Sequence, residues 1–148
     1  MTQEDKELLF KDLCARLPYG VIVVTPKGRG YVCNINLTIF DYELGVNINP
    51  IIRDPFSIND VKPYLFPLSS MTEEQEKEIQ QIIGNPDYAC IIRKTDGLEL
   101  WLNFIDTDPT IWLDAIFEVQ EYLNKNHFDY RGLIEKGLAI DVTGLNIY

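Results

Sequence analysis

Residues 88–104 have the sequence YACIIRKTDGLELWLNF, in which the pair Asp96-Gly97 separates two apolar runs. An Asp-Gly pair in this setting is the strongest local signal for a two-residue β-hairpin turn, because both central residues of that turn need positive φ angles. Leucines at positions 98, 100 and 102 alternate with other residues and indicate one buried face of the second strand. The stretch therefore predicts an antiparallel hairpin.

Helical patterns are found on both sides of this hairpin. Before it, Thr72 and Gln75 have the spacing of a capping box, and an acidic helix is expected from there to Gly84. After it, Pro109 stands at the first position of a helix predicted over 109–125, with Asp108 as its N-cap, because the apolar residues follow the helical period.

The chain beyond this helix predicts a second, shorter helix. Asn126 and His127 end the helix over 109–125, and Asp129 then has the right place to cap a helix over 130–136. Gly137 would close that short helix.

The amino-terminal half predicts one helix and several strands. A sequence close to a capping box begins a helix over 3–16, and β-branched and alternating residues predict a hairpin over 21–39. A third strand is expected within 44–52. We expect an ordered irregular connection over 53–72, because three prolines interrupt it and no period is visible.

Length and composition fit one globular domain over residues 1–148, since 46% of the residues are apolar and 11% are aromatic. Together these patterns predict an α+β fold. We expect a mainly antiparallel sheet of about five strands packed against the helices at 3–16 and 109–125, with the acidic helix at the surface.

The net charge of −10 is uneven, with −1 in residues 1–72 and −9 in residues 73–148. An acidic surface repels phosphate backbones, so nucleic acid is not expected as a partner, whereas a basic protein is. No apolar run approaches the ~20 residues of a membrane span, and the acidic start does not resemble a secretory signal. We therefore expect a cytoplasmic protein that binds no membrane, and its oligomeric state stays open.

Residues 27–34, KGRGYVCN, are similar to the RNP1 pattern of the RNA-recognition motif. Arg29 and Asn34 stand where that motif has aromatic residues, and a short strand precedes the stretch in place of a strand and a helix. We interpret it as a glycine-rich hairpin turn. The widely separated Cys14, Cys33 and Cys90 are interpreted as small buried residues, since no C-x-x-C spacing occurs.

The candidate site residues surround the single histidine. His127 and Asp129, followed by Tyr130 and Arg131, are compatible with the start of a metal site, or with a helix end and a cap. Trp101 lies on the opposite strand face from the leucines and would contribute to a partner surface if that face were open. No catalytic constellation and no cofactor are predicted, which favours a protein without enzymatic activity.

Residues 61–72 have the sequence VKPYLFPLSSMT, and residues 127–139 have the sequence HFDYRGLIEKGLA. These two stretches resemble a group of bacterial proteins found on phages and mobile elements. The resemblance implies a phage or mobile-element context and brings no activity, fold or catalytic residue with it.

We expect a non-catalytic interaction protein that binds a basic protein partner. Two alternatives remain open at this point. One is a small metal-dependent hydrolase around His127 and Asp129, and the other is a small-ligand binding module on the strand faces of Tyr31 and Trp101.

Overall fold

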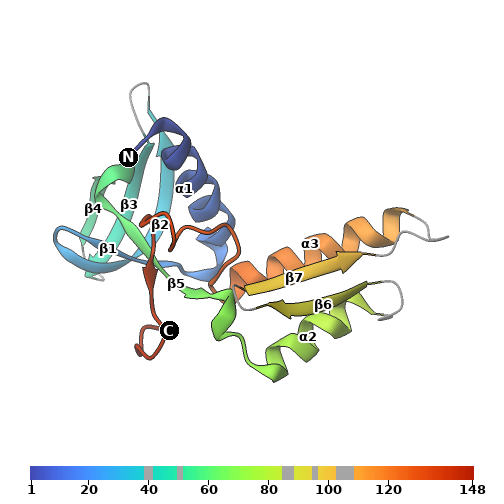
Figure 1. The fold of residues 1–148 in the computed structure, drawn as a ribbon. Coiled ribbons are helices and arrows are strands. Elements are labelled where there is room, and N and C mark those ends of the chain that lie inside the picture. The colour runs from blue at the N-terminus through green and yellow to red at the C-terminus, as the bar shows by residue number, and fades with distance from the viewer. Residues whose placement is uncertain (39–41, 50–51, 85–88, 95–96, 103–108) are drawn as a thin grey trace. The chain divides into compact units, whose positions relative to one another are not determined.

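A computed structural model describes residues 1–38, 42–49, 52–84, 89–94, 97–102 and 109–148 (Figure 1). The chain divides into two compact units. Unit 1 consists of Met1–Leu65 and Arg131–Tyr148, and unit 2 of Phe66–Tyr130. The fold is α+β with a mostly antiparallel sheet, as predicted. A single domain over residues 1–148 stays a prediction, because a unit inserted within another can fold together with it.

Unit 1 begins with helix α1, Gln3–Arg16, which continues into a short 3-10 turn, Leu17–Tyr19. The capping box is present as expected: Asp5 N–H donates to Thr2 Oγ1, and Thr2 N–H donates to the Asp5 carboxylate. These bonds satisfy two of the amide groups that every helix start leaves without an intrahelical partner.

The sheet of unit 1 is built from five antiparallel strands, to which one short parallel strand is added. Its order is β4-β3-β2-β1-β5, and β9 pairs with β5 in parallel. The bounds are β1 Ile22–Thr25, β2 Gly28–Leu37, β3 Tyr42–Asn49, β4 Ile52–Ser57, β5 Lys62–Pro67 and β9 Ile140–Asp141. The predicted hairpin over 21–39 is β1–β2.

The prediction of an irregular connection over 53–72 is wrong for much of that range. Strand β4 continues to Ser57, a 3-10 turn follows at Ile58–Asp60, and β5 and a second turn at Leu68–Ser70 occupy the rest. Pro55 is tolerated because β4 is an edge strand of this sheet. Pro63 pairs with Val23 of β1 at the first part of β5, before the pairing with β9 begins.

The core of unit 1 lies between α1 and one face of the sheet. Leu9 and Leu13 of α1 are completely buried, as are Val23, Leu44 and other strand residues of the same cluster. Gly30 is required where β2 crosses this face, because a Cβ there would lie 2.6 Å from the carbonyl oxygen of Asn47.

Unit 2 contains two helices, a hairpin and a short strand. These are α2 Glu73–Ile83, β6 Ala89–Lys94, β7 Gly97–Leu102, α3 Pro109–Lys125 and β8 Phe128–Asp129. The predicted hairpin and both predicted helices are confirmed, and the T-x-x-Q capping box of α2 is present. Asp96 and Asp108 lie outside the described residues.

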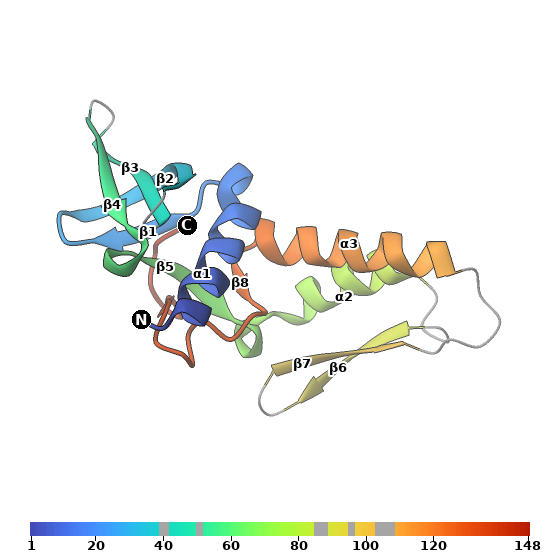
Figure 2. The same ribbon diagram turned by 90° about the horizontal axis from the view of Figure 1, so that it is seen from above.

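The two helices of unit 2 pack on each other, and the β6–β7 hairpin lies on one side of the pair (Figure 2). Their shared core contains Ile79 of α2, Val119 of α3 and Phe128 of β8, with Met71 beside them. Strand β8 pairs in parallel with the end of β5, Phe66 opposite Phe128. Helix α3 therefore packs against α2 and β8 within unit 2.

The prediction of a short helix over 130–136 is wrong. Glycines at both ends of this segment limit it to a turn. Gly132 and Gly137 have φ of +70° and +68°, which a continuing α-helix does not allow. Leu138 N–H donates to the Leu133 carbonyl and Gly137 N–H to that of Ile134, the pattern of a Schellman motif. Leu133 and Leu138 are buried in the core of unit 1, so the motif ends in an apolar contact.

Candidate functional site

His127 ends α3 by taking a left-handed backbone conformation. Its φ is +58°, the only positive value among the described residues other than glycine, and its N–H donates to the carbonyl of Asn124. Its own carbonyl accepts from Phe66 N–H at 2.9 Å. The residue is 6% exposed. The backbone of His127 therefore turns the chain from the helix onto strand β5.

Asp129 and Tyr130 follow His127 in the chain, and neither of them caps a helix. Asp129 belongs to β8, opposite Pro67, and is buried. It precedes no helix, so its predicted role as an N-cap is wrong. The Tyr130 hydroxyl accepts a hydrogen bond from Gln120 Nε2 at 3.1 Å, which ties the turn to α3. Among the described residues, no group of three His, Cys, Asp or Glu side chains has the arrangement of a metal site.

Arg131 belongs to unit 1, where it joins a buried ionic cluster. Its Nε lies 3.4 Å from Asp12 Oδ1. Asp12 also accepts two bonds from Arg16, from Nε to Oδ2 at 2.7 Å and from Nη2 to Oδ1 at 3.0 Å. Asp12 and Arg16 are both 0% exposed. Two guanidinium groups thus share one carboxylate, an arrangement in which each charge has a partner.

The sequence contains a local signal for the buried Asp12–Arg16 pair. Leu9, Asp12, Leu13 and Arg16 follow the spacing i, i+3, i+4, i+7, so they share one face of the helix. The charged pair lies on the same face as the buried leucines, which places it in the core. The geometry assigns Arg131 a structural contact with Asp12.

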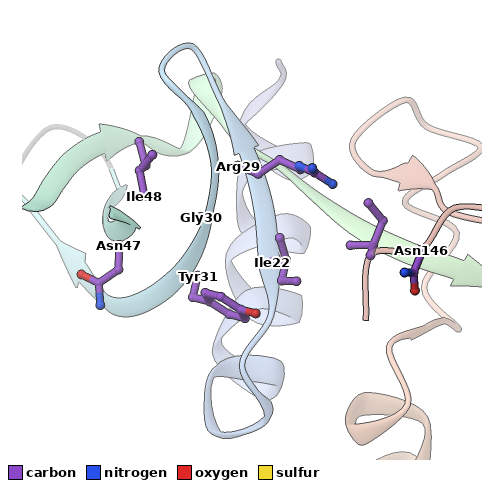
Figure 3. A pocket seen from close by; sticks show the side chains of 8 residues that line it. Ile22, Arg29, Gly30, Tyr31, Asn47, Ile48 and Asn146 are labelled. Atoms are coloured by element: carbon purple, nitrogen blue, oxygen red, sulfur yellow. The ribbon is translucent and has the colours of Figure 1, made fainter. Parts of the chain in front are cut away.

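The opposite face of the unit 1 sheet carries a shallow pocket (Figure 3). Its volume is about 290 Å³. Ile22, Tyr31 and Asn47 are cross-strand partners on β1, β2 and β3, so they form one row on this face. The other lining residues are Arg29, Gly30, Ile48, Asn146 and Ile147.

Strand β2 exposes Tyr31 by ordinary alternation of its side chains, and a bulge follows directly after it. Gly30 and Val32 are buried and Tyr31 is 56% exposed. A register shift between Val32 and Asn34 then brings Ile35 into contact with the core. A bulge inserts one residue and so moves the following side chains to the other face.

Tyr148 anchors the segment that forms one wall of the pocket. Ile22 N–H donates to its hydroxyl oxygen at 3.3 Å, and the hydroxyl donates to the carbonyl of Tyr64 at 2.7 Å. Burial of the hydroxyl end raises the Tyr148 pKa to about 12, and nearby Tyr31 and Asp12 act in the same direction. The hydrogen bond from Ile22 and the charge of Arg16 lower this pKa by less. The residue as a whole is 43% exposed, so only its hydroxyl end is enclosed.

Helix α3 of unit 2 has an exposed apolar stripe next to an acidic one. Leu113 is 54%, Ile116 36% and Phe117 63% exposed, and they have spacings of three and four residues. Asp114, Glu118 and Glu121 are exposed on the adjacent face of the helix. The stripe of Leu113, Ile116 and Phe117 with these three carboxylates is called the α3 surface below.

The buried face of α3 explains why the α3 surface is left open. Val119 and the partly buried Tyr122 and Leu123 pack with α2. The Tyr122 hydroxyl donates to Glu78 Oε2 at 2.6 Å. Burial and this bond raise the Tyr122 pKa. The packing of α3 on α2 therefore uses a face distinct from the α3 surface.

The acidic charge of the chain is concentrated in unit 2. This unit contains 13 acidic and 4 basic residues, a net of −9, and unit 1 contains 10 and 9, a net of −1. The net charges equal those of residues 1–72 and 73–148, because Glu135 and Asp141 belong to unit 1 together with Arg131 and Lys136.

Trp101 lies on β7, and its side chain is outside the described part of the structure, as are those of Leu98, Leu100 and Leu102. The partner surface expected around Trp101 stays a prediction.

Within the described ranges, every helix is too short or too polar to cross a membrane. Comparison of the chain with protein-family models, with curated proteins and with solved structures finds no match.

Proposed function

We propose that this chain is a non-catalytic interaction protein of a bacterial phage or mobile element, and that it binds a basic protein partner through the α3 surface. The observation that carries the proposal is the apolar stripe Leu113, Ile116 and Phe117, exposed beside Asp114, Glu118 and Glu121. The bacterial mobile-element context is supported only by the resemblance of residues 61–72 and 127–139.

The chemistry of the surface favours one class of occupant. Exposed apolar side chains at helical spacing suit an apolar face of a partner helix, and carboxylates beside them suit Lys or Arg at its edge. Unit 2 of a second copy of this chain would bring another net charge of −9 to the contact, and a nucleic acid would bring phosphates. Both are repelled, so a basic amphipathic segment fits best.

The test uses a labelled helical peptide of leucine and lysine with an amphipathic pattern, and its counterpart with glutamate in place of lysine. Fluorescence anisotropy measures their binding to the full chain. The lysine peptide is expected to bind, with weaker binding as salt concentration rises, and the glutamate peptide is not.

Variants locate the contact. Leu113→Ser with Phe117→Ser removes two apolar side chains and is expected to weaken binding by about tenfold or more. Asp114→Asn with Glu118→Gln is expected to reduce the salt dependence of lysine-peptide binding. Leu37→Ser is the matched control, because Leu37 is 73% exposed on β2 of unit 1. Equal binding of both peptides, or equal losses in the Leu37 control and the α3 variants, contradicts the proposal.

A further inference from the structure

We infer that the pocket on the unit 1 sheet binds a small anion that carries a planar ring, such as an aromatic carboxylate or a nucleoside monophosphate. The inference is independent of the proposed function, because the pocket lies in unit 1 and the α3 surface in unit 2.

Arg29 supplies the charge. Its side chain is exposed at the pocket and makes no ion pair with the described part of the chain. On the same hairpin, Lys27 forms an ion pair with Asp54, with 3.2 Å between Nζ and Oδ2. Arg29 is therefore more available than Lys27 to bind an anion. A guanidinium group presents parallel N–H donors, which match the oxygens of a carboxylate or phosphate.

Tyr31 supplies a planar surface next to this charge. Its ring extends from β2 towards Ile22, and Arg29 extends from β2 in the direction of the segment that carries Asn146 (Figure 3). Tyr31 is 56% exposed, although it lies in the middle of a sheet face. An exposed tyrosine face stacks on planar rings, and Ile22 and Ile48 add apolar contact.

Asn146 completes the pocket with an amide from a different segment. Its side chain makes no hydrogen bond with the described residues, so it can donate to or accept from a ligand. The segment is held by Tyr148 and by Val142 N–H, which donates to the Leu65 carbonyl. A cation, an aromatic ring and an amide thus converge on a space of about 290 Å³, which suits a small molecule.

Calorimetric titration of the full chain tests the inference with four probes. Adenosine 5′-monophosphate and 4-hydroxybenzoate carry both a ring and an anion, whereas adenosine lacks the anion and inorganic phosphate lacks the ring. At least one of the first two is expected to bind about tenfold tighter than adenosine and phosphate. The tighter binder of these two shows whether the pocket prefers a phosphate or a carboxylate.

Three variants decide whether this pocket is responsible. Arg29→Gln is expected to weaken binding by about tenfold, and Tyr31→Leu to weaken it while keeping apolar bulk. Lys27→Gln is the control, since it removes the same charge two residues away outside the pocket. Thermal unfolding confirms that each variant folds. The inference is overturned if neither planar anion binds, if phosphate binds as tightly, or if Arg29→Gln and Lys27→Gln have equal effects.

Discussion

Arg16 donates two hydrogen bonds to the carboxylate of Asp12, one helical turn earlier in α1, and both side chains are fully buried. The pair lies on the face of α1 that also carries Leu9 and Leu13. A buried pair of this kind is costly to break by removing one partner, because the other charge then stays in the core without compensation.

Asp12→Leu is therefore expected to lower the free energy of unfolding by about 3–5 kcal/mol. Asp12→Leu combined with Arg16→Met replaces both charges by apolar groups and should restore most of that loss, although Arg131 loses its contact with Asp12. Urea denaturation of the two variants and the wild type measures the difference. A double variant less stable than Asp12→Leu alone would show that the cost lies in packing and not in the unpaired charge.

Tyr148 connects the last segment to two strands of the sheet, and Tyr148→Phe removes that connection alone. The Ile22 N–H and the Tyr64 carbonyl both lose their partner, which is expected to cost about 1–3 kcal/mol. The variant should also weaken planar-anion binding at the pocket, because Asn146 is then less firmly held. Unfolding and calorimetric titration measure the two effects, and an unchanged stability would contradict the assigned bonds.

The same residue predicts a dependence of stability on high pH. Its pKa is about 12 in the folded chain and 10.0 in an ordinary tyrosine, so the folded state keeps the proton that the unfolded state loses. The contribution is fully present below pH 10 and is lost as the pH rises towards 12. Wild-type stability should therefore fall more steeply than that of Tyr148→Phe over this interval. Parallel slopes would show that Tyr148 titrates normally.

Gly137 closes the Schellman motif with φ of +68°, so its substitutions separate backbone strain from loss of contact. A Cβ at this position has no atom of the described structure within 4 Å, and steric clash is not the issue. Gly137→Ala is expected to cost about 1–2 kcal/mol, and Gly137→Asn less, because asparagine tolerates the left-handed conformation. Thermal unfolding compares them, and equal costs would argue against a strain-based explanation.

The exposed and buried faces of α3 should respond differently to substitution. Phe117→Ser, at 63% exposure, is expected to change the free energy of unfolding by less than about 0.5 kcal/mol, since the residue packs little in the folded chain. Val119→Ala, at 8% exposure in the core of unit 2, should cost about 1–3 kcal/mol. Strong destabilisation by Phe117→Ser would mean that the α3 surface serves folding.

The helices and both hairpins were predictable because their signals are local. Capping boxes, the Pro109 start and the alternating apolar runs of β6 and β7 each depend on a few adjacent residues. Strands β4 and β5 were missed because Pro55 and Pro63 suggested an irregular chain, and only the sheet order shows that they occupy tolerated positions.

The candidate sites were less predictable, because each depends on residues that are distant in sequence. Asp12 meets Arg131 only through the fold, and the pocket joins Arg29 to Asn146. The bulge in β2, which places Tyr31 and Ile35 on different faces of the sheet, depends on pairing with β3 and has no local signal. The acidic bias of the second half was visible in sequence, and unit 2 carries the same net charge of −9 as residues 73–148.

We propose that a basic partner binds at the α3 surface. The most direct measurement is an NMR titration of the ¹⁵N-labelled full chain with the leucine–lysine peptide. Chemical-shift changes that cluster on residues 113–121 of α3, and disappear with Leu113→Ser and Phe117→Ser, are the predicted result. Changes confined to unit 1, or spread evenly over the acidic residues of α2 and α3, would contradict it.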